Sequence, residues 1–349
     1  MCDMKLAVTG IGFWGKNILR NFFQLDNGLV KYAIDLDGRR LDFVNQHYPG
    51  VKTTPDFQQV LADPEIDAVA IVTPAESHFD LALAALKAKK HVFLEKPAAM
   101  TSHEVTVLAE TARLMGLQIM VDHTFMYNPA VTAIKDLLGQ NTLGRVYYIR
   151  MTRVNLGLFQ KHINVVWDLT PHDLSILLYL LPDKPHSLIA SGSSHITEGI
   201  EDVATLSLYY PNNLIAFITC SWIDPIKVRD CVIVGAERML YFDDTREAGE
   251  KITIFDKRVE GPKEYDSFQD FKYSYIYGDN HYVPVAEKEP LKNVAQAFLT
   301  AVSKNEQPLS NSRVARDIIC ILEAADRSIK RQGQRVVITY DDSHNPTHN

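Results

Sequence analysis

The stretch KLAVTGIGFWG, residues 5–15, decides the fold of the first half of the chain. Its first five residues form a mainly apolar run typical of a buried strand, and from Phe13 onward apolar residues recur at helical spacing. The GxGxxG motif between Gly10 and Gly15 therefore lies in a turn that joins a strand to a helix. That position predicts the first unit of a doubly wound parallel sheet of the Rossmann type, so the fold class is α/β.

Each glycine of the motif has a physical reason to stand where it does. Gly10 permits the tight turn, Gly12 lets the backbone approach a pyrophosphate, and Gly15 allows the helix to pack closely. The N-terminus of the helix supplies a site for the anion. The residues expected to bind a dinucleotide at this turn are Gly10, Gly12, Phe13, Trp14 and Gly15.

A carboxylate follows the second predicted strand, residues 29–34, about 20 residues beyond the last glycine. This residue, Asp35, can accept hydrogen bonds from the adenosine ribose hydroxyls and would repel a 2'-phosphate, so NAD is favoured over NADP. Arg39 and Arg40 leave NADP open, because either guanidinium could reach a 2'-phosphate. The alternative interpretation of Asp35 is an ordinary polar turn.

Three further predicted strands, residues 66–72, 92–94 and 118–121, each end in polar residues. Ligands bind beyond the carboxyl ends of parallel strands, so we expect these residues to line one edge with the glycine turn. Pro97 biases Lys96 away from the helical region, and its ammonium can then be aimed at a substrate. An ordinary surface Glu-Lys pair is the alternative. The residues expected at this edge are Thr73, Pro74, Glu95, Lys96, Asp122 and His123, with His78 opening the helix after Pro74.

Beyond residue 124 the alternation of strand and helix gives way to consecutive strands. We expect a C-terminal α+β domain with a large, mainly antiparallel open sheet, on which helices 291–304 and 313–332 pack. Such a sheet has a second face to cover, which predicts a homodimer or homotetramer. The expected domains are 1–124 for dinucleotide binding, 125–340 for substrate binding and oligomerisation, and a polar tail at 341–349.

Asp168 and His172 stand four residues apart near the start of a predicted apolar helix. If the helix begins at Asp168, both side chains share a face and the carboxylate can orient the imidazole. The helix dipole and a nearby Lys96 favour neutral imidazole while Asp168 favours the cation, which suits a base working near neutral pH. An N-capping aspartate beside a surface histidine is the alternative. The candidate substrate contacts are Arg153, Asn155, Asn164 and Trp167.

The composition excludes several classes of function. The 349 residues carry a net charge of -7, so no basic field is available for nucleic acid or an anionic membrane. Apolar runs are too short to span a bilayer, and we expect a cytoplasmic protein. Neither the 12 histidines nor the four cysteines show a metal-ligand spacing, so no metal is predicted. Reduced thiols are expected, although Cys220 and Cys231 could be cross-strand neighbours; the other cysteines are Cys2 and Cys320.

These motifs in this order (GxGxxG, an acid after the second strand, TPxxxH and EKP) resemble the Gfo/Idh/MocA family of nicotinamide-dependent oxidoreductases. Residues 12–17 and 20–22 are similar to the branch that acts on nucleotide-linked sugars in polysaccharide pathways, although Lys16 stands where that branch commonly has Pro. Met126 stands near a position where relatives often carry Arg. The resemblance implies that Lys96, Asp168 and His172 converge on the reacting carbon, and that family members oligomerise through the open sheet.

The resemblance leaves three functions to weigh. The first is an NAD-dependent dehydrogenase acting on a secondary alcohol of a nucleotide-sugar, with His172 as general base, Asp168 orienting it and Lys96 holding the substrate oxygen. The second keeps the enzyme but takes a free cyclitol or aldose as substrate. The third is a cofactor-binding regulator that has lost catalysis, and the presence of all three acid-base residues argues against it.

Overall fold

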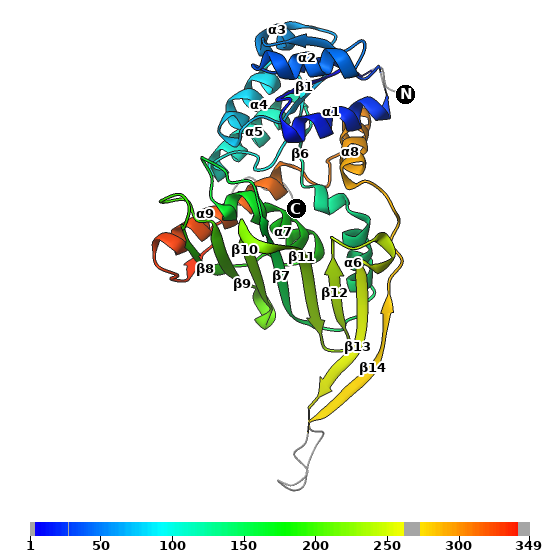
Figure 1. The fold of residues 1–349 in the computed structure, drawn as a ribbon, viewed down its shortest axis with the longest axis vertical. Coiled ribbons are helices and arrows are strands. Elements are labelled where there is room, and N and C mark those ends of the chain that lie inside the picture. The colour runs from blue at the N-terminus through cyan, green and yellow to red at the C-terminus, as the bar shows by residue number, and fades with distance from the viewer. Residues whose placement is uncertain (1–3, 27, 262–272, 341–349) are drawn as a thin grey trace. The chain divides into compact units, whose positions relative to one another are not determined.

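The computed structural model describes residues 4–26, 28–261 and 273–340, so Cys2 and the predicted polar tail at 341–349 lie outside the described residues. The chain forms two compact units (Figure 1). The first comprises Met1–Asn128 and Lys288–Cys320, and the second comprises Pro129–Glu287 and Ile321–Asn349. The predicted domain limits, 1–124 and 125–340, stay a prediction. The segment Lys288–Cys320 falls within the second predicted domain, but in the structure it is part of the first unit.

The first unit is built on a six-stranded sheet in the order β3-β2-β1-β4-β5-β6, with neighbouring strands all parallel. The apolar strands are buried on both faces, as a parallel sheet between helices requires. This confirms the predicted doubly wound sheet. The strands are β1 Leu6–Thr9, β2 Val30–Ile34, β3 Lys52–Thr54, β4 Ala68–Ile71, β5 His91–Leu94 and β6 Ile119–Val121; the helices are α1 Phe13–Leu25, α2 Gly38–His47, α3 Phe57–Ala62, α4 His78–Lys87, α5 Ser102–Met115 and α8 Pro290–Lys304.

Helix α8 belongs to the core of this first unit. Its Phe298 ring packs edge-on against Phe22 and Phe93, with ring centroids 6.2 and 5.6 Å away. The prediction that this helix packs on the second sheet is therefore wrong. Its apolar stripe shows that one face must be buried, but the stripe carries no information about which sheet buries it.

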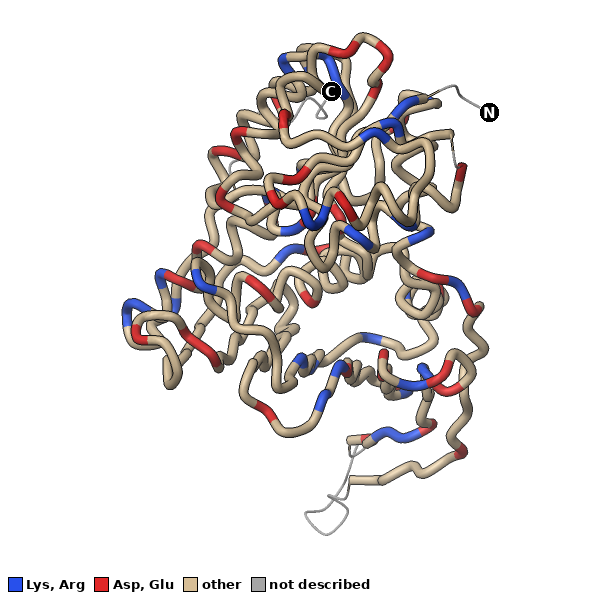
Figure 2. Tube along the Cα trace, turned by 45° about the horizontal axis from the view of Figure 1, so that its top comes forward, with Lys and Arg blue, Asp and Glu red and all other residues tan. Residues whose placement is uncertain are grey.

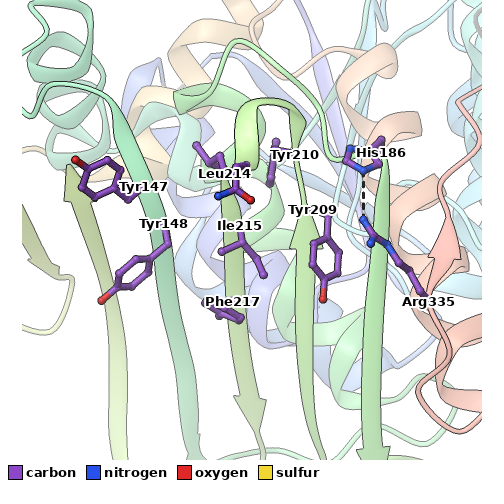
Figure 3. Close-up of a pocket in the computed structure, with 10 residues that line it drawn as sticks. Tyr147, Tyr148, His186, Tyr209, Tyr210, Leu214, Ile215, Phe217 and Arg335 are labelled. Atoms are coloured by element: carbon purple, nitrogen blue, oxygen red, sulfur yellow. Dashed lines mark hydrogen bonds between the residues drawn. The ribbon is translucent and has the colours of Figure 1, made fainter. Parts of the chain in front are cut away.

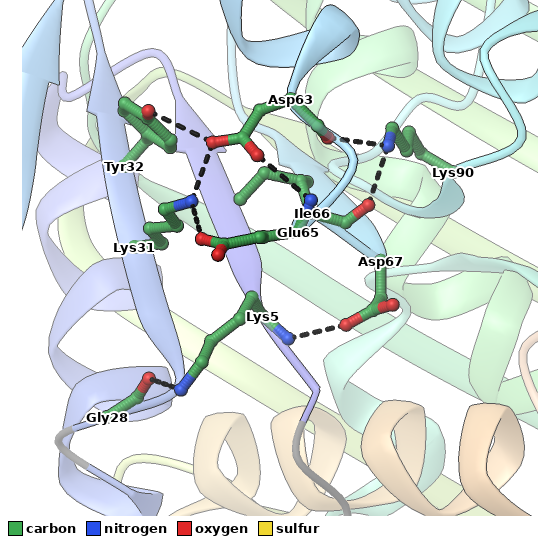
Figure 4. A network of polar contacts seen from close by, with 9 residues as sticks. All are labelled: Lys5, Gly28, Lys31, Tyr32, Asp63, Glu65, Ile66, Asp67 and Lys90. Carbon is green, nitrogen blue, oxygen red and sulfur yellow. Dashed lines mark hydrogen bonds and ion pairs between the residues drawn. The ribbon is translucent and has the colours of Figure 1, made fainter.

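A polar network holds the amino ends of the first sheet (Figure 4). The Asp63 carboxylate accepts hydrogen bonds from Lys31 Nζ at 2.7 Å and from the Tyr32 hydroxyl at 3.1 Å. The buried Lys90 ammonium donates to the Asp63 and Ile66 carbonyls at 2.9 and 2.7 Å. These charged residues form hydrogen bonds within the first unit. The polar residues that follow the carboxyl ends of the strands lie at the opposite end of the sheet.

The second unit is built on a nine-stranded sheet in the order β14-β13-β12-β11-β7-β10-β9-β8-β15. Only the β7–β10 pair among these described strands is parallel, which confirms a mainly antiparallel sheet. The strands are β7 Val146–Leu156, β8 Ser187–Ser193, β9 Val203–Tyr209, β10 Ile215–Ser221, β11 Ile223–Gly235, β12 Met239–Asp243, β13 Ile252–Glu260, β14 Ser274–Tyr282 and β15 Val336–Val337.

Strand β7 lies between β10 and β11, and this separates two cysteines. Cys220 pairs with Arg153 and Cys231 pairs with Met151, on opposite sides of β7. The alternative that these cysteines are cross-strand neighbours is wrong. Both are buried and belong to no disulfide, and the same holds for Cys320.

The two faces of the second sheet differ in character. Ile149, Met151 and Ile218 are buried on the face next to α7 Val165–Leu180. Helix α6 Pro129–Gly139 lies in this unit, and α9 Ser312–Lys330 begins in the first unit and ends in the second. The other face carries exposed aromatic side chains, among them Tyr148 and Phe217. They line a pocket of about 650 Å³ (Figure 3), with Tyr147, His186, Tyr209, Tyr210, Asn213, Leu214, Ile215 and Arg335.

Acidic and basic residues are interspersed along the trace of the chain (Figure 2). The net charge of -7 is thus a small excess over many charges of both signs. Within the described residues, no helix combines the length and apolar character needed to cross a membrane. In the same part of the chain, no group of three or more His, Cys, Asp or Glu side chains is arranged to hold a metal ion.

Candidate active site

The glycine turn has the geometry of a phosphate-binding loop. Gly10 adopts a φ of +87°, and a Cβ there would meet the Val72 carbonyl oxygen at 2.5 Å. A Cβ on Gly15 would lie 1.8 Å from the Gly10 carbonyl oxygen, so this helix packs as closely as the motif predicts. A Cβ built on Gly12 would have Arg40 Nη1, at 3.9 Å, as its nearest described neighbour.

The start of α1 is open to an anion. Gly12 is its N-cap and provides no side-chain cap, so the first N–H groups of the helix remain available to a ligand. Phe13 and Trp14 stand there with exposed fractions of 71% and 53%. The adjoining pocket of about 380 Å³ is lined by Ile11, Gly12, Phe13, Lys16, Asn17 and Arg40. These residues fit the pyrophosphate of a dinucleotide.

Asp35 holds the glycine turn in place through a hydrogen bond to its backbone. Its carboxylate accepts hydrogen bonds from the backbone N–H of Ile11 at 2.7 Å and from that of Asp37 at 2.8 Å. Arg40 Nη1 donates to the same carboxylate at 3.1 Å, and Arg39 pairs with Asp37 at 2.9 Å. Both arginines that could hold a 2'-phosphate are thus engaged by carboxylates, which supports NAD. The ribose contact of Asp35 itself stays a prediction.

His78 ties together two of the loops at the carboxyl edge. Its Nδ1 lies 2.8 Å from the Pro97 carbonyl oxygen and its Nε2 lies 2.8 Å from that of Thr73. Two carbonyl acceptors favour the imidazolium, but burial lowers the pKa of His78 and Lys96 adds to this effect. Burial is the largest of these effects on the pKa of His78. His78 therefore holds the turn that carries Lys96, which explains its place after Thr73 and Pro74.

Lys96 shares its edge with two buried ionisable residues. Strands β5 and β6 pair in parallel, and the Asp122 N–H donates to the Leu94 carbonyl at 2.8 Å, so Glu95-Lys96 and Asp122-His123 leave neighbouring strand ends. Burial raises the pKa of Asp122 to about 6, against the opposing effects of Thr124 and Lys96. Burial also lowers the pKa of His123 to about 3, and Lys96 lowers it further.

In the second unit, helix α7 begins at Val165, with Asn164 as its N-cap. The helix thus begins before Asp168, the start considered above, because the Asn164 side chain accepts from the Trp167 N–H at 3.1 Å. Pro171 lies inside the helix. Asp168 and His172 are still one turn apart on the same helix face.

The Asp168 carboxylate is oriented by a residue that the sequence did not single out. Trp222, which is 1% exposed, donates its Nε1–H to Asp168 Oδ2 at 3.0 Å. Its backbone N–H donates to the Asp202 carbonyl at 2.9 Å, and Phe159 packs on its ring. The sequence signal for Trp222 is a tryptophan at the end of a strand, because a buried indole usually finds an acceptor for its single N–H donor. Trp222 fixes the carboxylate that can in turn orient His172.

The predicted substrate contacts lie in this unit with partners of their own. Asn164 donates to Glu201 at 2.8 Å, and the Trp167 Nε1–H donates to Asp326 at 2.8 Å. Arg153 is 5% exposed and makes three hydrogen bonds of 2.8 to 3.1 Å to Asp173. The substrate roles of these residues and of the half-buried Asn155 stay predictions.

The fold and the glycine turn define a class: a dinucleotide-binding protein that joins a Rossmann unit to an open-sheet unit. Residues 4–123 match the model of an oxidoreductase family with an NAD-binding Rossmann fold, and residues 131–241 match the GFO/IDH/MocA C-terminal domain. The chain belongs to the Gfo/Idh/MocA family of oxidoreductases, and its first unit is an NAD-binding domain.

Several characterised proteins are similar to this chain. UDP-N-acetylglucosamine 3-dehydrogenase of Acidithiobacillus ferrooxidans is 31% identical over 63% of this chain and 68% of that protein. Myo-inositol 2-dehydrogenase of Thermotoga maritima is 24% identical over 56% of this chain, and D-apiose dehydrogenase of Paraburkholderia graminis is 27% identical over 62%. The chain spans 60% of the length of each of these two.

Solved structures confirm the fold. The same Acidithiobacillus enzyme superposes with a TM-score of 0.78 at 22% identity, covering 95% of this chain and 99% of that one. A levoglucosan dehydrogenase in complex with NADH and levoglucosan superposes with a TM-score of 0.80 at 18% identity, covering 97% of this chain and 100% of that one. At these identities the likeness establishes the architecture alone.

Proposed function

We propose that this protein transfers a hydride between NAD and a secondary alcohol or ketone of a nucleotide-linked sugar. The observation that carries the proposal is the Trp222–Asp168 hydrogen bond, which holds a carboxylate one helical turn from His172. An oriented carboxylate beside an imidazole is the arrangement that a general base for an alcohol needs. The 31% identity to a UDP-N-acetylglucosamine 3-dehydrogenase supports the nucleotide-sugar.

The chain's own residues would divide the chemistry as follows. His172 removes the proton of the substrate hydroxyl, and Asp168 orients the ring and stabilises the imidazolium that results. Lys96 donates a hydrogen bond to the substrate oxygen and stabilises negative charge as it develops there. Bound NAD supplies the hydride acceptor. Reduction of a ketosugar uses the same residues in the reverse order.

A free cyclitol or aldose is the second candidate substrate. The similarity to myo-inositol 2-dehydrogenase and D-apiose dehydrogenase favours it, because neither name includes a nucleotide. The two candidates separate in one assay. We expect UDP-, GDP- or dTDP-linked sugars to be oxidised with a far lower KM than the corresponding free sugars, and equal KM values would favour the second candidate.

We also propose that the protein works as a homodimer or homotetramer in the cytoplasm. The exposed aromatic face of the second sheet, including Tyr148 and Phe217, supports self-association, since a patch of this kind favours a partner. Buried cysteines outside any disulfide, at Cys220, Cys231 and Cys320, suit a reducing compartment. A Phe217→Asp variant is expected to lower the mass measured by light scattering, and an unchanged mass would count against this face.

The function is tested by following the absorbance of reduced nicotinamide while candidate sugars are mixed with NAD and the protein. Lys96→Ala and His172→Ala are expected to lower kcat by 10²-fold or more while the folded variants still bind NAD. Lys87→Ala and His103→Ala, which replace exposed residues of the same types, are the matched controls. Parental rates in the first two variants would refute the assignment.

A further inference from the structure

His123 is a buried histidine with no hydrogen-bond partner for either ring nitrogen. Its side chain is 1% exposed, and neither Nδ1 nor Nε2 meets a donor or acceptor within the described residues. A buried polar atom left without a partner costs free energy comparable to a lost hydrogen bond, and native proteins rarely keep two on one side chain. His123 therefore needs an explanation beyond packing, because an apolar residue of similar size would fill the space without that cost.

The position of His123 points to the bound ligand. It follows β6, the neighbour of β5, and Lys96 follows β5 at the same edge. The glycine turn lies on the same edge after β1, so a dinucleotide anchored there extends across β4 toward β5 and β6. The orphaned imidazole thus stands at the end of the edge where the nicotinamide and the substrate are expected.

The charges around His123 decide which chemical group suits it. Lys96 and Asp122 are the ionisable residues that act on this end of the edge, and Thr124 donates to Asp122 at 2.7 Å. Burial and the Lys96 ammonium both oppose protonation of the ring, so it offers one N–H donor and one lone-pair acceptor. An anion would need the protonated ring. The group that complements the neutral His123 ring is itself neutral and can both donate and accept a hydrogen bond.

We infer that His123, as neutral imidazole, hydrogen-bonds a neutral polar group of the bound ligands, either the carboxamide of the nicotinamide or a hydroxyl of the sugar. The possibility that the partner is a sugar hydroxyl rests on the proposed function, whereas the possibility that it is the carboxamide requires only that the first unit binds NAD. In both cases the ligand provides the hydrogen-bond partner that the described residues do not, so His123 contributes to affinity and not to the stability of the free chain.

The test compares NAD with ADP-ribose, which keeps the adenosine and pyrophosphate but lacks the nicotinamide. Calorimetry on His123→Leu is expected to show about tenfold weaker NAD binding and unchanged ADP-ribose binding if the carboxamide is the partner. If a hydroxyl is the partner, NAD and ADP-ribose both bind as before and the KM for the sugar rises about tenfold. His123→Asn or His123→Gln, which keep an amide donor and acceptor, should restore part of the loss.

The thermal midpoint of the ligand-free protein separates this role from a structural one. His123→Leu is expected to melt at or above the parental temperature, because it removes two unsatisfied polar atoms. A midpoint several degrees lower, with NAD, ADP-ribose and sugar bound as in the parent, would overturn the inference. The His103→Leu variant controls for loss of a histidine on the surface. If the parent binds NAD but oxidises no sugar, the proposed function fails and the NAD to ADP-ribose comparison still decides the role of His123.

Discussion

Replacing Asp173 with alanine tests whether Arg153 holds the second unit together. Arg153 is 5% exposed and Asp173 is 1% exposed, so the variant removes a buried carboxylate that pairs with a buried cation. Arg229 pairs with Arg153 across β11 and β7, and burial with the Arg153 charge lowers the pKa of Arg229. Removal of the carboxylate therefore leaves these two neighbouring cations with one negative charge fewer beside them.

The expected cost follows from the three hydrogen bonds of 2.8 to 3.1 Å between Arg153 and Asp173. Removing one member of a buried pair costs about 3–5 kcal/mol, because the buried charge that remains loses these hydrogen bonds and stays out of contact with water. For a unit of about 150–250 residues that corresponds to a midpoint lower by roughly 10 °C. Arg246→Ala, which breaks the half-exposed pair with Asp243 in the same unit, should cost about 0–1 kcal/mol.

Guanidinium unfolding followed by tryptophan emission provides the measurement. Trp167 and Trp222, two of the three tryptophans, lie in the second unit and report on it. The double variant Arg153→Met with Asp173→Leu should recover most of the loss, since an apolar pair replaces the charges. A cost below about 1 kcal/mol for Asp173→Ala would refute this reasoning, as would a double variant no more stable than the single one. A rise in KM for Arg153→Met at unchanged stability would instead favour a substrate contact.

Three other predictions concern the first unit. Gly15→Ala should abolish NAD binding or prevent folding, because its Cβ would lie 1.8 Å from a carbonyl oxygen; calorimetry and circular dichroism check this. His78→Leu should cost about 1–3 kcal/mol in denaturant unfolding and lower kcat, because the Pro97 and Thr73 carbonyls lose their partner beside Lys96. Burial raises the pKa of Asp122 to about 6, so its ionisation opposes folding and its contribution to stability falls as the pH rises from about 4 through 6. Asp122→Asn should thus match the parent near pH 4 and exceed it by about 2–3 kcal/mol at pH 8 in unfolding measured at both pH values.

The parts of the molecule that could be predicted from the sequence are those with local causes. The glycine turn requires Gly10 at positive φ and Gly15 without a side chain, and this chemistry is contained in six residues. The helix after residue 101 is another case, because Thr101 and Glu104 form the expected capping box and Gly116 ends it in the left-handed conformation. In these places backbone sterics and nearby hydrogen bonds are sufficient.

The parts that could not be predicted depend on pairings distant in sequence. Strand β7 inserts between β10 and β11, so no local pattern separates Cys220 from Cys231. The Trp222–Asp168 contact joins residues 54 positions apart, and the Arg153–Asp173 pair arises where a strand end meets a helix. Alternation shows which residues of a strand are buried, but the partner that covers them is set by the order of the whole sheet.

The position of α8 bears on how the protein is made. Phe22 and Phe93 are complete early in translation, but Phe298, which closes their cluster, emerges only after most of the chain has left the ribosome. Until α8 is synthesised, the aromatic surface formed by Phe22 and Phe93 is therefore uncovered, and a folding intermediate with such a surface is prone to aggregate. A fragment ending at residue 128 is expected to aggregate, whereas the same fragment with residues 288–320 joined by a flexible linker should remain in solution.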